Sequence, residues 1–205
     1  MNWLSRLRNW HTYRQLRFTE ADLVVLDLEL TGLDPKRDEI VSAAWVEIRQ
    51  GRVILNSARH VLNKEVHQLG QSPVIHGVDE QALQQGDTLR ALLQQLGSLL
   101  EQRILVCHNA LLDWGFIKRA FVHHDIETRP KLILDTMQIE RDRLLRQGQT
   151  LTADCLTLSA CRQRYGLPHA SEHHALSDAL STAELLLAQN SQFGGAHGAL
   201  VRQLT

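Results

Sequence analysis

An alternating run near the N-terminus, from Asp22 to Leu30, constrains the fold of this chain more than any other feature. Apolar residues at every second position predict a β-strand with one fully apolar face. The other face carries Asp27 and Glu29 among apolar neighbours, which argue against the alternative of an exposed edge strand with solvated acids. Two ionised carboxylates side by side in a protein interior are costly unless a cation neutralises them. The run therefore predicts a buried strand that contributes to a cation site.

A second acidic element follows a short apolar strand predicted at 104–107. The pair His108-Asn109 ends this strand, and the helix that begins near residue 110 carries Asp113 back across the carboxyl end of the sheet. Open α/β sheets usually build their sites at such strand ends. An aspartate in the first turn of a helix also interacts favourably with the helix dipole, so Asp113 alone does not define a site.

A third element lies at the start of the last long helix, predicted at 174–189. Asp178 shares a face of this helix with Ala175 and Thr182, which mark it as a packed surface. An ionised aspartate on such a face needs a partner. His173 can sit at the start of the helix and reach over the same site.

The periodicity of apolar residues predicts the fold class. Three strands with short connections come first, at 22–30, 39–48 and 52–61, and indicate an antiparallel meander. Helices and strands then alternate, with helices at 89–100, 110–121, 137–146, 155–165 and 174–189 and strands at 104–107 and 132–134. A meander followed by alternating units can extend one sheet in parallel, so we predict a mixed α/β sheet flanked by helices.

The chain of 205 residues, 43% of them hydrophobic, is long enough for one sizeable core, which we place at 21–190. Residues 1–20 predict a basic amphipathic helix. We favour packing of this helix on the domain, with a partner-binding or DNA-binding arm as the alternative. The glycine-containing segment 191–205 is expected to be a flexible tail.

Composition limits the kind of nucleic-acid binding and the cellular compartment that we expect for this chain. A net charge of −1 gives no sign of a generic nucleic-acid coat, so any affinity for nucleic acid must be local. Three cysteines without a C-x-x-C spacing suit reduced thiols in a cytoplasm. No apolar run approaches the ~18 residues of a membrane span, so we expect a cytoplasmic protein with no membrane contact.

Three motifs in this order resemble the DEDDh family of 3′-to-5′ exonucleases. They are D-L-E at 27–29, H-N-x-x-x-D at 108–113 and H-x-A-x-x-D-A at 173–179. The closest likeness is to the DnaQ-like branch, which includes the proofreading epsilon subunit of bacterial DNA polymerase III, and it spans about residues 22–189. Three motifs at the right spacing are far more specific than any one of them. The fold that this resemblance implies is RNase H-like.

The resemblance also implies roles for individual residues. Asp27 would bridge two divalent metal ions, Mg²⁺ or Mn²⁺, with Glu29 and Asp178 as ligands and Asp113 as a supporting carboxylate. His173 would be the general base for the attacking water.

Four further residues are implied to hold the terminal nucleotide, namely Leu30, Thr31, His76 and Asn109. The implied partner is the 3′ end of a nucleic acid, with single-stranded DNA favoured and RNA possible. The implied products are nucleoside 5′-monophosphates.

Two alternatives remain open from the sequence. The run from Asp27 to Gly32 is also similar to oligoribonuclease, and a metal cluster hardly distinguishes sugars, so RNA trimming is one alternative. The other is an RNase H-like scaffold that only binds nucleic acid, because a fold does not guarantee a function. A protein partner bound through the N-terminal helix is compatible with each of these.

Overall fold

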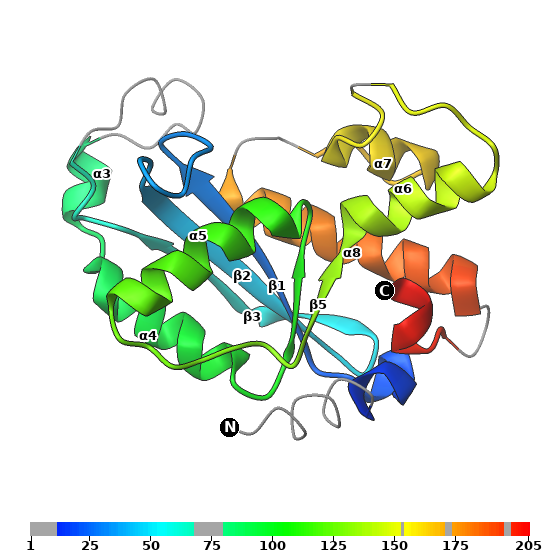
Figure 1. Ribbon diagram of the computed structural model, residues 1–205, viewed down its shortest axis with the longest axis horizontal. Coiled ribbons are helices and arrows are strands. Elements are labelled where there is room, and N and C mark those ends of the chain that lie inside the picture. The colour runs from blue at the N-terminus through cyan, green and yellow to red at the C-terminus, as the bar shows by residue number, and fades with distance from the viewer. Residues whose placement is uncertain (1–11, 68–79, 153, 171–173, 195–197) are drawn as a thin grey trace.

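A mixed five-stranded sheet in the order β3-β2-β1-β4-β5 forms the centre of the protein (Figure 1). The structure, a computed structural model, describes residues 12–67, 80–152, 154–170, 174–194 and 198–205. Strands β1 (Leu23–Leu30), β2 (Ile40–Arg49) and β3 (Arg52–Leu62) form the antiparallel meander. Strands β4 (Ile104–Cys107) and β5 (Leu132–Asp135) run parallel to β1. The predicted order of elements is confirmed.

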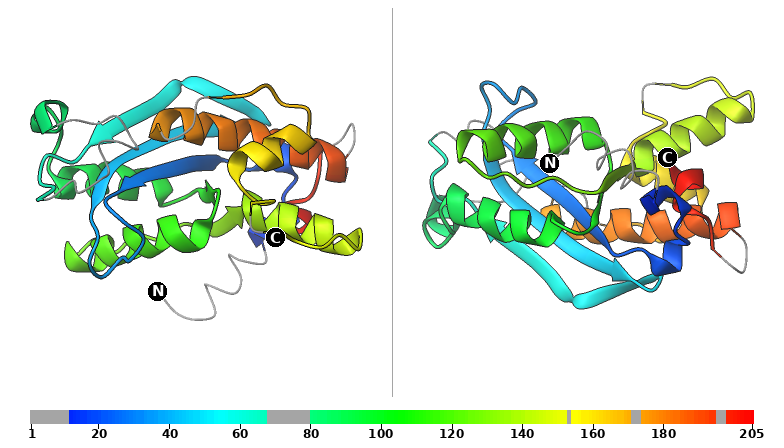
Figure 2. Two further views of the ribbon diagram at one scale, coloured as in Figure 1. Left: turned by 90° about the horizontal axis from the view of Figure 1, so that it is seen from above. Right: turned by 60° about the horizontal axis from the view of Figure 1, so that its bottom comes forward.

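Helices cover both faces of this sheet (Figure 2). Helices α4 (Leu89–Leu100) and α5 (Ala110–His123) lie on one face. Helix α8 (Ala175–Gly194) crosses the opposite face against β1, β2 and β3, with α6 (Thr136–Arg146) and α7 (Leu158–Arg164) beside it. A short helix, α3 (Glu80–Gln84), was not predicted. None of the helices in the described part of the chain is long and apolar enough to cross a membrane.

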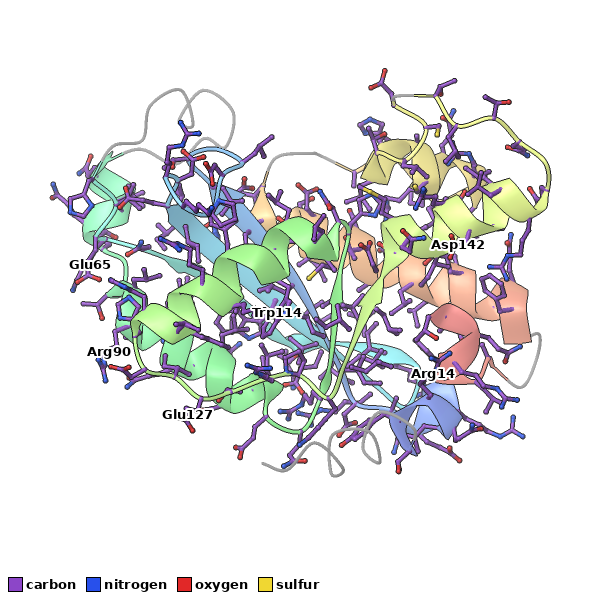
Figure 3. The ribbon with its side chains drawn as sticks, in the orientation of Figure 1. Arg14, Glu65, Arg90, Trp114, Glu127 and Asp142 are labelled. Carbon is purple, nitrogen blue, oxygen red and sulfur yellow. The ribbon has the colours of Figure 1, made fainter. Side chains whose placement is uncertain are left out.

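Strand β1 separates two hydrophobic cores. Val24, Leu26 and Leu28 pack with α4 and α5, and Trp114 of α5, labelled in Figure 3, joins this core. Leu23 and Val25 pack on the other side with α8. Because side chains alternate along a strand, Asp27 and Glu29 continue the row of Leu23 and Val25 and project toward α8. The predicted alternation is therefore confirmed, and it places both acids in front of the last long helix.

The two ends of the described chain pack against each other. Arg17 forms a β-bridge with Leu200, and the N–H of Phe18 donates to the carbonyl of Ala199. Val201 and Leu204 are buried in the core under α8. The prediction of a flexible tail over 191–205 is therefore wrong for the described part of that segment, because its apolar residues complete a core. Of the predicted N-terminal helix, residues 12–15 are helical and residues 1–11 lie outside the described residues.

Truncation of Leu204 to alanine is expected to reduce the free energy of unfolding by about 2–5 kcal/mol, as for other leucines in a packed core. The side chain is only 1% exposed. Leu145→Ala is the matched control, because that leucine is 49% exposed on α6. Urea denaturation of both variants measures the difference. Equal stability of the two variants would contradict the packed C-terminal segment.

Candidate active site

Three carboxylates meet between β1 and α8. Asp27 and Glu29 come from β1 and Asp178 from the first turn of α8, and one oxygen of each lies within 4.8 Å of the others. Glu29 is 4% exposed, so this cluster is set into the protein and not on an open surface. Segments about 150 residues apart in sequence thus supply one compact set of oxygen donors.

The start of α8 lies close to β1 for two local reasons. The backbone N–H of Ala175 donates a hydrogen bond to the carboxylate of Glu29, which ties the first residue of the helix to the strand. Ala175 and Ala179 are fully buried, and their small side chains let the helix approach the sheet. Asp178 lies between them on the helix and therefore faces the two acids of β1.

The electrostatics of this cluster favour a bound cation. Burial, and then the charge of Asp178, raise the pKa of Glu29 to about 7. Burial raises the pKa of Asp27 well above its usual value, and the charges of Asp113, Asp178 and Glu29 add to the effect. Such shifts mean that the ionised carboxylates lack sufficient neutralising charge. A donor set of carboxylate oxygens alone fits a hard divalent cation.

Asp113 lies at the edge of this cluster. It is 5% exposed in the first turn of α5, and it is not part of the compact group of three formed by the described residues. Its charge nevertheless raises the pKa of Asp27, so the two carboxylates are close. Burial raises the pKa of Asp113, while a hydrogen bond from the thiol of Cys107 opposes this shift. This placement agrees with a carboxylate that supports the cluster from outside.

Three of the predicted substrate-binding residues, Leu30, Thr31 and Asn109, are described. Leu30 is buried at the end of β1. The hydroxyl of Thr31 accepts a hydrogen bond from the N–H of Glu39, so this side chain closes the connection between β1 and β2. Asn109 begins α5 in a left-handed conformation, and its side chain makes no capping hydrogen bond. Leu30 and Thr31 directly follow Glu29 in the chain, and Asn109 precedes Asp113 by four residues.

The two predicted histidines, His173 and His76, lie outside the described residues. The neighbouring His174 is described and exposed, and its ring lies 5.0 Å from the ring of His60 on β3. His60 in turn lies 3.0 Å from the hydroxyl of Ser42. No local sequence pattern predicts this contact, because it joins an edge strand to a helix start more than a hundred residues later.

His108 has a structural role that the sequence did not predict. Its Nδ1 lies 2.8 Å from the hydroxyl of Thr136 and its Nε2 lies 2.9 Å from the carbonyl of Leu156. Burial lowers the pKa of His108, so the ring is neutral near pH 7. A neutral ring donates from Nε2 to the carbonyl and accepts from the hydroxyl at Nδ1. His108 therefore ties three segments together and does not reach the cluster.

A cavity of about 250 Å³ opens beside Asp178. It is bordered by α7, α8 and the segment 167–170, and Arg162 and Ser181 belong to its lining. The buried guanidinium of Arg162 donates to the carbonyls of Ser181 and Pro168 and pairs with Glu184. This arginine holds the wall of the cavity in place.

Comparison with known proteins yields a family and several relatives. A family model described as "Exonuclease" (RNase_T) matches residues 24–186. The PolC-type DNA polymerase III of Thermotoga petrophila is 30% identical over 171 residues, which are 83% of this chain and 12% of that protein. The 3′-5′ exonuclease DinG of Staphylococcus epidermidis is 26% identical over 184 residues, 90% of this chain and 20% of that protein. The chain thus spans at most a fifth of the length of these relatives.

Solved structures show the same fold. Escherichia coli exonuclease I in complex with a dA16 oligonucleotide has a TM-score of 0.70 at 16% identity, covering 83% of this chain and 41% of that chain. Cell-death related nuclease 4 also has a TM-score of 0.70, at 20% identity, covering 88% of this chain and 66% of that chain. The predicted RNase H-like fold is confirmed by these neighbours.

Proposed function

Since the chain belongs to the exonuclease family whose model matches residues 24–186, we propose that it hydrolyses nucleic acid from the 3′ end and releases nucleoside 5′-monophosphates. One observation carries the proposal. Asp27, Glu29 and Asp178 bring carboxylate oxygens within 4.8 Å of one another at a partly enclosed site. Phosphodiester hydrolysis needs concentrated positive charge at the phosphate, and this donor set is suited to hold it.

The four carboxylates would hold two divalent cations, Mg²⁺ or Mn²⁺. In this proposal Asp27 would be shared between them, Glu29 and Asp178 would bind directly, and Asp113 would support the cluster from α5. The proximity of Asp27, Glu29 and Asp178 and the effect of the Asp113 charge on the pKa of Asp27 support these roles. When bound, such cations stabilise the negative charge on the attacking and leaving oxygens of the phosphate. The carboxylates themselves fix this charge in one position, because β1 and the starts of α5 and α8 are packed against two cores.

His173 is proposed to accept the proton of the attacking water. It directly precedes His174 in the chain, just before α8. The hydrogen bond from the backbone N–H of Ala175 to the carboxylate of Glu29 keeps the start of that helix beside the carboxylates. A histidine is suited to this role because its ordinary pKa lies near the pH at which such enzymes work. Asn109, Leu30, Thr31 and His76 are proposed to contact the terminal nucleotide.

Single-stranded DNA is the proposed substrate. DinG is described as a 3′-5′ exonuclease, and the structural neighbour exonuclease I holds a single-stranded DNA oligonucleotide. The net charge of −1 on the chain argues for contacts near one strand end and against binding along a long duplex.

Strand polarity provides the test. With Mg²⁺ present, a single strand labelled at its 5′ end is expected to shorten progressively, while the same strand with a 3′-phosphate resists, because the site is proposed to receive a free 3′-hydroxyl. Gel electrophoresis of the labelled strand reads both results. RNA of the same sequence, run in parallel, decides the sugar preference. Cleavage of a circular single strand would place the protein among endonucleases and overturn the proposal.

A further inference from the structure

Asp135, outside the carboxylate cluster, binds an unusual number of backbone groups. It is the last residue of β5 and the N-cap of α6. Its Oδ1 accepts from the N–H of Met137 at 3.0 Å and of Gln138 at 3.4 Å, which caps α6. The same carboxylate also accepts from Asn109 at 3.0 Å and Ala110 at 2.9 Å, at the start of α5. Capping needs only the first two bonds, so the other two call for a separate explanation.

The sheet explains how one carboxylate reaches both helices. Strands β4 and β5 are parallel, and Cys107 is paired with Asp135 in register. The two strands therefore end at the same level, and the chain leaves both ends into a helix. A carboxylate at the end of β5 lies between the two helix starts and can accept from both sets of free N–H groups.

The bonds to α5 fix one backbone conformation. Asn109 has φ 81° and ψ 59°, in the left-handed region that few residues other than glycine adopt, although asparagine does so more readily than most. The N–H groups of Asn109 and Ala110 stand on either side of the φ and ψ angles of residue 109. Because both donate to one carboxylate, these angles are held.

The conformation of Asn109 determines how α5 begins, and α5 carries Asp113 of the candidate active site. The carbonyl of Asn109 accepts from the N–H of Leu112 at 3.0 Å and of Asp113 at 3.4 Å, forming the first turn of α5. The direction of that turn sets where the carboxylate of Asp113 lies relative to Asp27. It also sets where the side chain of Asn109 points.

We infer that Asp135 is a positioning residue of the exonuclease site, which holds Asn109 in its left-handed conformation and thereby places Asn109 and Asp113. The inference rests on the proposed function, in which these two residues serve the substrate and the metal ions. Residues that orient a metal ligand from outside typically change metal affinity or activity about 10–100-fold when they are replaced. Asp135 touches neither metal nor substrate and acts through the start of α5.

The test is Asp135→Asn, which keeps the shape of the side chain but replaces one acceptor oxygen with an NH₂ group that faces a backbone N–H. We expect kcat/KM on single-stranded DNA to fall about 10–100-fold at a temperature where the variant is fully folded. Mn²⁺ binding, followed by electron paramagnetic resonance without substrate, is expected to weaken in the same variant because Asp113 has moved.

Two matched controls separate positioning from stability. Thr88→Ala removes the N-cap of α4, and Asp142→Asn makes the same chemical change on α6 away from α5. Both should keep kcat/KM and Mn²⁺ affinity close to those of the wild type, even where the melting temperature falls. An Asp135→Asn variant that behaves like Thr88→Ala, less stable but equally active, would overturn the inference. A wild type inactive on every strand would instead overturn the proposed function, and Mn²⁺ binding would still test Asp135.

A double-mutant cycle tests the route through Asn109. Glycine adopts the left-handed conformation without strain, so in an Asn109→Gly background the additional loss from Asp135→Asn should be at least about threefold smaller than in the wild type. Equal losses in both backgrounds would show that Asp135 does not act through the backbone of residue 109.

Discussion

Replacement of Asp27 by asparagine is expected to abolish hydrolysis while it stabilises the metal-free protein. Asp27 is close to every other carboxylate of the cluster, so its loss removes the ligand that both cations would share. Bound cations typically stabilise the transition state of such a reaction by several kcal/mol, so we expect kcat to fall by about 10³-fold or more. Asp178→Asn should have a comparable effect. Near-wild-type activity in either folded variant would refute the metal assignment.

The stability of the metal-free protein supplies the second readout of this experiment. A carboxyl group whose pKa is higher in the folded than in the unfolded state stabilises the protein at pH values below its unfolded-state pKa. This stabilisation is lost as the pH rises through its folded-state pKa. For Glu29 that window runs from 4.5 to about 7. In EDTA, the wild type should therefore lose stability between these pH values. Asp27→Asn removes one repelling charge and should therefore lose less stability than the wild type over this pH range.

Differential scanning fluorimetry in EDTA at pH 5 and pH 8 measures this difference. In a domain of this size, each kcal/mol of relieved repulsion raises the melting temperature by about 2–4 °C. Asp142→Asn, an acid-to-amide change on α6 outside the cluster, is the control and should show the pH dependence of the wild type. Lower stability of Asp27→Asn than of the wild type at pH 8 would contradict the repulsion that the cluster implies.

Replacement of His173 by alanine is expected to reduce kcat about 10²–10⁴-fold, the usual contribution of a general base. Metal binding by the carboxylates should persist. In the wild type, activity should fall at low pH as the imidazole becomes protonated. This acidic limb of the pH–activity profile should flatten in His173→Ala. Saturating Mg²⁺ is needed throughout, because weakened metal binding at low pH produces a similar limb.

His174→Ala is the matched control for that experiment. Its exposed ring packs against His60, so its removal should leave kcat nearly unchanged. If His174→Ala were the crippled variant and His173→Ala the mild one, the motif would have been placed one residue too early.

The sequence was sufficient for those features that depend on local periodicity. Alternation along 22–30 predicted which face of β1 carries Asp27 and Glu29, and the two separate cores confirm it. The spacing of the helical motif predicted that Asp178 lies on the packed face of its helix, and in the structure that face is turned toward Asp27 and Glu29 of β1. Such predictions succeed because a side chain's direction follows from its position in a strand or helix.

Features that depend on distant contacts were not predictable in this way. The C-terminal segment contains glycines typical of a loose tail, yet Val201 and Leu204 are buried because the segment pairs with residues near Arg17. The hydroxyl of Thr31 accepts a hydrogen bond from the N–H of Glu39 across the β1–β2 connection, which no local pattern predicted, while the contact of Thr31 with the substrate stays a prediction. In both cases the deciding partner lies outside the window that a local pattern covers.

The pairing of the two ends has a topological consequence. Arg202 lies 3.2 Å from the side chain of Gln15, so the described chain comes close to forming a closed ring. An exposed turn such as the one at Gly148 is therefore a suitable place to open the described chain in a circular permutant. In such a permutant, with residues 12 and 205 joined by a linker, we expect Asp27 and Asp178 to stay together whatever the order in which the elements are synthesised, because α8 contacts β1 directly.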